Sequence, residues 1–188
     1  RDIDASVKEF RPDIVALSIR NIDNSAGYNT LFLLENVKNE IVIPLKKSFN
    51  GPIVIGGPSV GISGAEMLKY LDLPLAIRGD GENAMIELIE SLENKRSLIK
   101  IKGLVCQENG QIIQDNSPHL VDKLDELSMP RPYRYINLEP YRRFDSPLQI
   151  QTKRGCPLTC SYCTYNRIEG LYFRLRDPQL VADEIEEL

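Results

Sequence analysis

The run Pro52-Ile53-Val54-Ile55-Gly56-Gly57 has the composition of a β-strand with both faces buried. Strands of parallel sheets are covered by helices on both sides, so they appear as continuous apolar runs rich in valine and isoleucine. A glycine pair follows the last apolar residue, and glycine lets the backbone adopt a positive φ or approach a ligand closely. The run therefore predicts a strand whose C-terminal end adjoins a ligand site.

The same pattern occurs on both sides of this run. Residues 14–18 form an apolar run that ends in a serine, and residues 75–79 form another that ends in Arg-Gly. Two helix signals follow: Ser63-Gly64-Ala65-Glu66 matches a capping box, and residues 85–92 carry apolar side chains at helical spacing. This alternation of strand, turn and helix predicts an α/β fold with a doubly wound parallel sheet, its strands buried on both faces.

Two other segments have weaker or more local signals. Residues 31–38 suggest a helix, but residues 41–49 contain Pro44, which fits only near a helix start. Asn109-Gly110 lies between two short apolar runs and predicts a β-hairpin. We expect this hairpin to finish a first domain, residues 1–115, that is incomplete at its N-terminus.

The remaining chain divides into a linker and a second domain. Residues 116–147 contain five prolines and no long apolar run, which predicts an ordered linker along the surface. Residues 148–152 alternate like a strand and lead into a cysteine-containing loop. Asp177-Pro178 then predicts a helix start, with Asp177 as N-cap and proline at the first helical position. The second domain is expected to comprise residues 148–188.

The loop carries Cys156, Cys160 and Cys163 in a C-x3-C-x2-C pattern, which lets one short segment surround a metal centre with three thiolates. Three are too few for a closed tetrahedral zinc site, whereas an iron–sulfur cluster held by three cysteines keeps one iron open. The other possible zinc ligands, Cys106 and His119, lie far away in sequence. The pattern therefore favours a cluster over a zinc knuckle or three buried cysteines. We expect Cys106 to be a packing residue and His119 an ordinary surface histidine.

The composition is that of an ordinary globular protein, with 42% hydrophobic and 27% charged residues among 188. The net charge of −4 argues against a nucleic-acid-binding surface, which is usually basic. No apolar run approaches the roughly 20 residues that cross a bilayer. Four cysteines, three of them clustered, fit a reducing compartment better than a disulfide framework, so we predict a cytoplasmic location.

The cysteine loop resembles the radical S-adenosylmethionine signature, C-x3-C-x-aromatic-C, with Tyr162 in the aromatic position. The chain as a whole resembles the cobalamin-binding branch of that family, in which a Rossmann-like cobalamin domain precedes a barrel. The stretches that carry this second resemblance are residues 12–18, 55–58, 78–82 and 124–127. It implies a Rossmann-like cobalamin-binding domain, a linker, and the truncated first βα unit of a radical S-adenosylmethionine partial TIM barrel.

The resemblance also implies cofactors and residue roles. Cys156, Cys160 and Cys163 would bind three irons of a four-iron four-sulfur cluster, the fourth iron would chelate S-adenosylmethionine, and Tyr162 would pack near its adenine. Ser18, Gly56 and Gly57 match positions that contact the nucleotide tail of cobalamin. For these last three residues the plainer interpretation stays open, in which Ser18 ends a strand and the glycines form a turn. The loop at residues 20–24 is a secondary candidate for contact with cobalamin.

The function implied is that of a cobalamin-dependent radical S-adenosylmethionine enzyme, which cleaves S-adenosylmethionine to a 5′-deoxyadenosyl radical for methyl transfer or cyclisation. Its partners would be a small-molecule substrate and a reductant such as flavodoxin or ferredoxin, with no nucleic acid. The residues that would choose the substrate are not recognised, no residue is assigned a catalytic role, and we expect the chain by itself to be inactive. Two alternatives stay open: a non-catalytic module that binds cobalamin or a nucleotide-like ligand, and a zinc-binding interaction domain.

Overall fold

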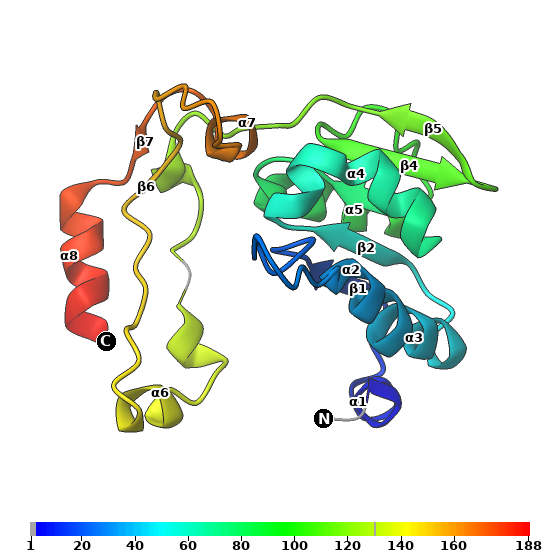
Figure 1. The fold of residues 1–188 in the computed structure, drawn as a ribbon, viewed down its shortest axis with the longest axis horizontal. Coiled ribbons are helices and arrows are strands. Elements are labelled where there is room, and N and C mark those ends of the chain that lie inside the picture. The colour runs from blue at the N-terminus through cyan, green and yellow to red at the C-terminus, as the bar shows by residue number, and fades with distance from the viewer. Residues whose placement is uncertain (1–2, 130) are drawn as a thin grey trace. The chain divides into compact units, whose positions relative to one another are not determined.

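The computed structural model describes residues 3–129 and 131–188 and divides the chain into two compact units (Figure 1). The first unit is Arg1–His119 and the second is Leu120–Leu188. The predicted linker therefore contributes its first residues to the first unit and the rest to the second. The division into cobalamin domain, linker and barrel start stays a prediction. Within the described residues, no helix has the length and apolar character needed to cross a membrane.

The first unit is built on a five-stranded mixed sheet in the order β1-β2-β3-β4-β5 (Figure 1). Its first three strands are parallel and its last two antiparallel: β1 (Val15–Ser18), β2 (Ile53–Gly56), β3 (Leu75–Ile77), β4 (Leu104–Glu108) and β5 (Gln111–Asp115). The predicted α/β class is confirmed, and so is the hairpin at Asn109-Gly110. Both turn residues have positive φ, 49° and 77°, which the tight connection between β4 and β5 requires.

Helices of the first unit cover both faces of the sheet, as the apolar strand runs predict. They are α1 (Ile3–Phe10), α2 (Leu33–Asn36), η1 (Val37–Val42), α3 (Ile43–Ser48), α4 (Pro58–Leu71) and α5 (Gly81–Glu93). Alternation along β2 separates the two cores. Ile53 and Ile55 belong to the cluster that contains residues of α2, α3 and α4, whereas Val54 belongs to the cluster that contains Leu88 of α5.

The strand β1 corrects one expectation. Its four residues alternate between half-buried and exposed, so it is not buried on both faces. Val15 and Leu17 pack against the core on the α4 side, whereas Ala16 and Ser18 are exposed. The reason is tertiary: β1 lies at the edge of the described sheet, and an apolar run does not reveal how many neighbours a strand has.

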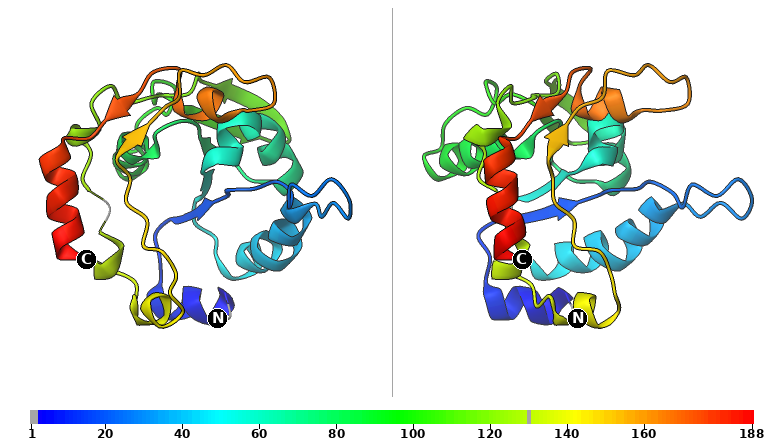
Figure 2. Two further views of the ribbon diagram at one scale, coloured as in Figure 1. Left: turned by 60° about the vertical axis from the view of Figure 1, so that its left-hand side comes forward. Right: turned by 90° about the vertical axis from the view of Figure 1, so that its left-hand side faces the viewer.

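The segment around Pro44 forms a continuous helix from α2 through η1 to α3 (Figure 2). Pro44 is at the start of α3, but that helix continues directly from the π-helical η1 instead of beginning in a loop. Proline lacks the N–H that would bond to the carbonyl four residues earlier. The preceding turn is wider, and the N–H of Ile43 donates to the carbonyl of Lys38, five residues back. A π-helical turn therefore leads into the proline.

The described residues of the second unit form these elements: η2 (Leu124–Glu126), η3 (Pro132–Arg134), α6 (Glu139–Arg143), β6 (Lys153–Arg154), α7 (Tyr165–Glu169), β7 (Arg174–Leu175) and α8 (Pro178–Glu187). The strand predicted at residues 148–152 does not form; instead the two-residue strand β6 begins at Lys153 and pairs antiparallel with β7. The predicted helix start is confirmed, since the N–H of Gln179 donates to the Asp177 carboxylate at 2.7 Å.

A small core and one buried arginine connect the start of the second unit with the segment just before α8. Val121, Leu124 and Leu127 form a buried cluster. The buried guanidinium of Arg176 donates to the carbonyl oxygens of Leu124 at 3.0 Å and Leu127 at 3.3 Å. Arg176 thus holds the main chain of the second unit together.

Candidate functional site

Two predicted cofactor residues lie side by side at the carboxyl edge of β1 and β2. Ser18 and Gly56 are register partners in the parallel pair. The N–H of Ile19 donates to the carbonyl of Gly56 at 2.8 Å, so the pairing extends one residue beyond β1. In open α/β sheets, ligands bind outside this edge.

Gly57 has a structural role that explains its identity. It has a φ of 96° and precedes the first residue of α4. A Cβ atom there would lie 2.8 Å from the carbonyl oxygen of Ile19 and 3.0 Å from Oγ of Ser18. Only glycine combines this φ with so close an approach of the two crossing chains.

Gly56 differs from its neighbour. A Cβ atom there would have one atom within 4 Å, the carbonyl oxygen of Ile77 at 3.9 Å. Neither backbone conformation nor packing therefore requires glycine at this position. The missing side chain leaves space next to Ser18, which is exposed.

Ser59, which the sequence did not single out, fixes the loop that follows β1. Its buried hydroxyl donates to the carbonyl of Arg20 at 2.6 Å, and its N–H donates to the carbonyl of Ile19 at 3.3 Å. The start of α4 thereby holds the beginning of the loop at residues 20–24. A serine two residues after a Gly-Gly pair is a signal that could have found it.

His119 is held by its main chain. It forms a parallel bridge with Gly79, and the N–H of Asp80 donates to its carbonyl at 2.7 Å. Asp80 is buried and precedes α5. These main-chain bonds make His119 part of the first unit.

The cysteine loop joins β6 to α7 in the second unit and is drawn in orange in Figure 2. Cys156 is half-buried, whereas Cys160 and Cys163 are exposed. The N–H of Cys163 donates to the carbonyl of Cys160 at 3.2 Å, which closes a turn between these two residues. All three cysteines are free thiols.

The three sulfurs do not converge in this conformation. Across residues 3–129 and 131–188, no three His, Cys, Asp or Glu side chains are grouped closely enough to hold a metal ion. The donor set nevertheless fits a cluster, because three free thiols on one open loop can each supply one iron ligand. Cys106 is not an alternative iron ligand, because it is buried in the sheet core and burial raises the pKa of its thiol. Its predicted packing role is confirmed.

The first part of the loop, from Gly155 to Leu158, is anchored. Gly155 has a φ of 86°, and a Cβ atom there would lie 1.9 Å from the carbonyl oxygen of Tyr172. The N–H of Cys156 donates to the carbonyl of Gly170 at 3.0 Å. Further along the loop, the side-chain amide of Asn166 in α7 donates to the carbonyl of Leu158 at 3.0 Å. The loop is therefore open in the middle and fixed at its base.

Other side chains near the loop have distinct roles. Partial burial raises the pKa of the Tyr165 phenol, and the adjacent Glu169 carboxylate, to which it is hydrogen-bonded, raises it further. Arg174 donates to the carbonyls of Val121 and Glu169, so it holds main chain like Arg176. Tyr162 is 88% exposed and contributes no core packing.

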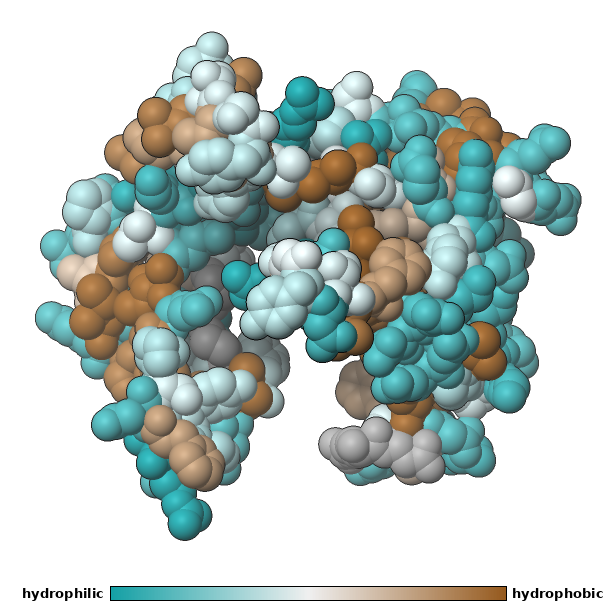
Figure 3. All heavy atoms as spheres, in the orientation of Figure 1, coloured by the Kyte–Doolittle hydropathy of each residue, from teal (hydrophilic) through white to brown (hydrophobic). Residues whose placement is uncertain are grey.

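The surface of the second unit carries many large apolar side chains (Figure 3). Those at least half exposed include Tyr135, Phe144, Leu158, Leu171, Tyr172 and Leu175. A patch-rich surface of this kind is typical of a segment that is covered by other protein.

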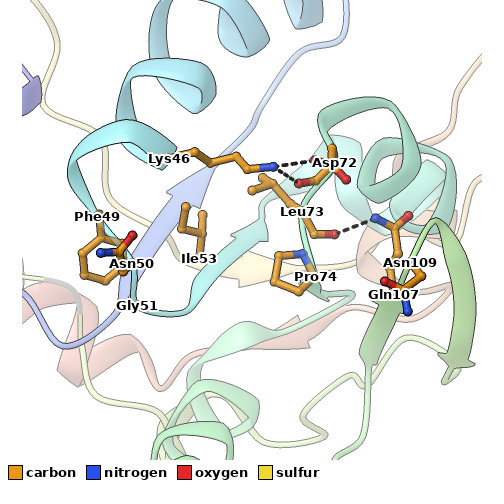
Figure 4. Close-up of a pocket in the computed structure, with 10 residues that line it drawn as sticks. All are labelled: Lys46, Phe49, Asn50, Gly51, Ile53, Asp72, Leu73, Pro74, Gln107 and Asn109. Carbon is orange, nitrogen blue, oxygen red and sulfur yellow. Dashed lines mark hydrogen bonds and ion pairs between the residues drawn. The ribbon is translucent and has the colours of Figure 1, made fainter.

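A cavity of about 370 Å³ opens at the opposite, amino-terminal edge of β2 and β3 (Figure 4). One wall is the ion pair of Lys46 with Asp72, at 2.5 Å. The other is the amide of Gln107, which donates to the carbonyl of Leu73 at 3.3 Å. No predicted site residue lines this cavity.

Comparison with known proteins gives the class. No family model matches the chain. An anaerobic magnesium-protoporphyrin IX monomethyl ester cyclase of Synechocystis sp. is 30% identical over 159 residues, 83% of this chain and 29% of that protein. Among solved structures, the radical S-adenosylmethionine methyltransferase TsrM of Kitasatospora setae, with cobalamin and a [4Fe-4S] cluster bound, matches with a TM-score of 0.83. It is 22% identical, over 100% of this chain and 38% of that one.

A second structure agrees. The cobalamin-dependent S-adenosylmethionine radical enzyme OxsB matches with a TM-score of 0.76 and 19% identity, over 98% of this chain and 24% of that one. The homologues and structural neighbours of the chain are thus cobalamin-dependent radical S-adenosylmethionine enzymes, as the resemblance predicted. The likeness to TsrM confirms the Rossmann-like fold. The chain spans 29 to 39% of the length of the curated relatives that it matches.

Proposed function

We propose that the chain is a segment of a cobalamin-dependent radical S-adenosylmethionine enzyme, and that Cys156, Cys160 and Cys163 bind three irons of a four-iron four-sulfur cluster. The single observation that carries this proposal is the loop of three free thiols, fixed at its base and open in the middle. When bound, such a cluster supplies the electron that cleaves S-adenosylmethionine to a 5′-deoxyadenosyl radical, for methyl transfer or cyclisation.

The residues of the loop have different roles in binding the cluster and S-adenosylmethionine. The three sulfurs bind iron as thiolates, and the exposed Cys160 and Cys163 have room to turn toward Cys156. Gly155 places Cys156 by holding the main chain against Tyr172. The exposed Tyr162 is available to cover the adenine of S-adenosylmethionine.

We assign the cobalamin contact to the edge formed by Ser18 and Gly56. The support is the open space at Gly56. The fold does not require glycine at this position, so the space is available to a ligand. Gly57 shapes this edge through its backbone, because its φ and its contact with Ile19 account for its identity. The two glycines of the pair therefore have different roles.

The rest of the proposal concerns the whole protein. TsrM was solved with its tryptophan substrate. By analogy we propose a small-molecule substrate here, a reductant such as flavodoxin or ferredoxin, and a cytoplasmic location. The exposed apolar side chains of the second unit support its being covered by further barrel elements.

The cluster is tested by anaerobic reconstitution of the full-length protein with iron and sulfide. We expect a broad brown absorbance and bound acid-labile sulfide in the wild type, and loss of most of both in Cys160→Ala. Cys106→Ala is the matched control and should load like the wild type, because Cys106 lies in the sheet core. Equal iron and sulfide in wild type and Cys160→Ala would refute the assignment. Zinc in place of iron would support an interaction domain, and neither metal a non-catalytic module.

The cobalamin edge is tested by titration of the full-length protein, followed by visible absorbance. Gly56→Val should weaken binding by at least tenfold, since its side chain would fill the space beside Ser18 while valine suits a strand. Gly27→Val is the matched control, because nothing lies within 4 Å of a Cβ atom at Gly27. Circular dichroism checks folding. Unchanged affinity in folded Gly56→Val would remove Gly56 from the site.

A further inference from the structure

The short helix α7 and the glycine after it make three hydrogen bonds to the cysteine loop. The carbonyl of Gly170 accepts from the N–H of Cys156 at 3.0 Å. The carboxylate of Glu169 accepts from the N–H of Gly155 at 3.4 Å. The amide of Asn166 donates to the carbonyl of Leu158 at 3.0 Å. The first two contacts fix the base of the loop, and the third reaches into the loop itself.

Asn166 is itself held in place. It is half-buried, and its carbonyl accepts from the N–H of Gly170 at 3.0 Å. Its side chain is therefore presented to the loop by a main chain that also carries the Cys156 anchor. An asparagine amide has two donors and suits a carbonyl that no helix or sheet satisfies.

The bonded carbonyl lies at a decisive place in the loop. Leu158 is midway between Cys156 and Cys160. The turn from Cys160 to Cys163 already fixes the second and third cysteines relative to each other. The Asn166 bond connects the arm of the first cysteine with the helix that follows the third.

From this geometry we infer that Asn166 is a positioning residue, which holds the three cysteine arms in one arrangement around the cluster. The inference rests on the proposed cluster site and deepens it. Groups that orient metal ligands typically change metal affinity by 10- to 100-fold when removed. Because Leu158 is exposed, the lower end of that range applies. Loss of the amide should leave the cluster able to form but easier to lose.

The test uses the full-length protein, reconstituted anaerobically, in wild-type, Asn166→Ala and Asn166→Gln forms. Iron transfer to a ferrous chelator is followed by absorbance, together with the electron paramagnetic resonance spectrum of the reduced cluster. We expect Asn166→Ala to release iron about tenfold faster than the wild type, with a broadened spectrum. Asn166→Gln retains the amide donors and should recover most of the wild-type rate.

Asn137→Ala is the matched control. The Asn137 side chain also makes one local bond to main chain, accepting from the N–H of Glu139 at 3.0 Å, in the same unit but outside the loop. Asn137→Ala should release iron at the wild-type rate, although its thermal unfolding midpoint falls about as far as that of Asn166→Ala. Equal release by wild type and Asn166→Ala, or acceleration by Asn137→Ala as well, would overturn the positioning role. Absence of iron and sulfide from the wild type would instead overturn the proposed cluster site itself.

Discussion

Replacing Gly155 by alanine is expected to destabilise the second unit and to prevent iron and sulfide uptake. The new methyl group would lie 1.9 Å from the carbonyl oxygen of Tyr172, well inside van der Waals contact. The φ of 86° adds strain for any residue with a Cβ atom. Together these effects cost about 2 to 5 kcal/mol. Relief requires the two chains to separate, which breaks the bond from Cys156 to Gly170.

Gly110→Ala separates the strain of a positive φ from the steric overlap. Gly110 also has a positive φ, 77°, but no atom lies within 4 Å of a Cβ atom there. This variant should lose only the conformational part, about 1 kcal/mol. Urea unfolding followed by circular dichroism, with iron and sulfide analysis, compares the two variants. Normal cluster loading in Gly155→Ala would show that the contact with Tyr172 does not hold the loop.

Gly79→Ala is expected to have an effect of similar size on the first unit. Its Cβ atom would lie 2.1 Å from the carbonyl oxygen of His119, at a φ of 86°. The bridge from Gly79 to His119 and the bond from Asp80 to His119 would both be disrupted. We expect the free energy of unfolding to fall by about 2 to 5 kcal/mol.

Gly81→Ala is the matched control, two residues further on. Its Cβ atom would meet only Cγ2 of Ile77 at 3.8 Å, an ordinary contact. Because Gly81 begins α5, alanine there should leave stability unchanged or raise it by up to about 1 kcal/mol. Urea unfolding of the full-length protein measures both variants. Similar destabilisation by Gly79→Ala and Gly81→Ala would contradict the steric argument.

Local signals were sufficient for much of the fold. The apolar runs at residues 53–56 and 75–77 became β2 and β3, because a strand buried on both faces must be apolar throughout. Asn109-Gly110 became the hairpin turn, and Asp177 became the N-cap of α8. For the hairpin turn and the N-cap, the deciding interaction lies within a few residues along the chain.

Other features depended on contacts between distant segments. The exposure of Ala16 in β1 follows from its place at the sheet edge, and the order of His119 follows from its bridge to Gly79. Arg176 lies just before α8, yet it is buried. The carbonyl oxygens of Leu124 and Leu127 accept hydrogen bonds from its guanidinium there. No pattern of neighbouring residues reports such partners.

The candidate site divides in the same way. Spacing alone identified Cys156, Cys160 and Cys163, because one short loop must supply all three thiols whatever the surrounding fold. Sequence also placed Ser18 and the glycine pair at strand ends. Only the tertiary structure distinguished Gly56, which borders open space, from Gly57, which contacts Ile19. Only the tertiary structure joined Asn166 to Leu158, because that bond depends on the path of the chain between them.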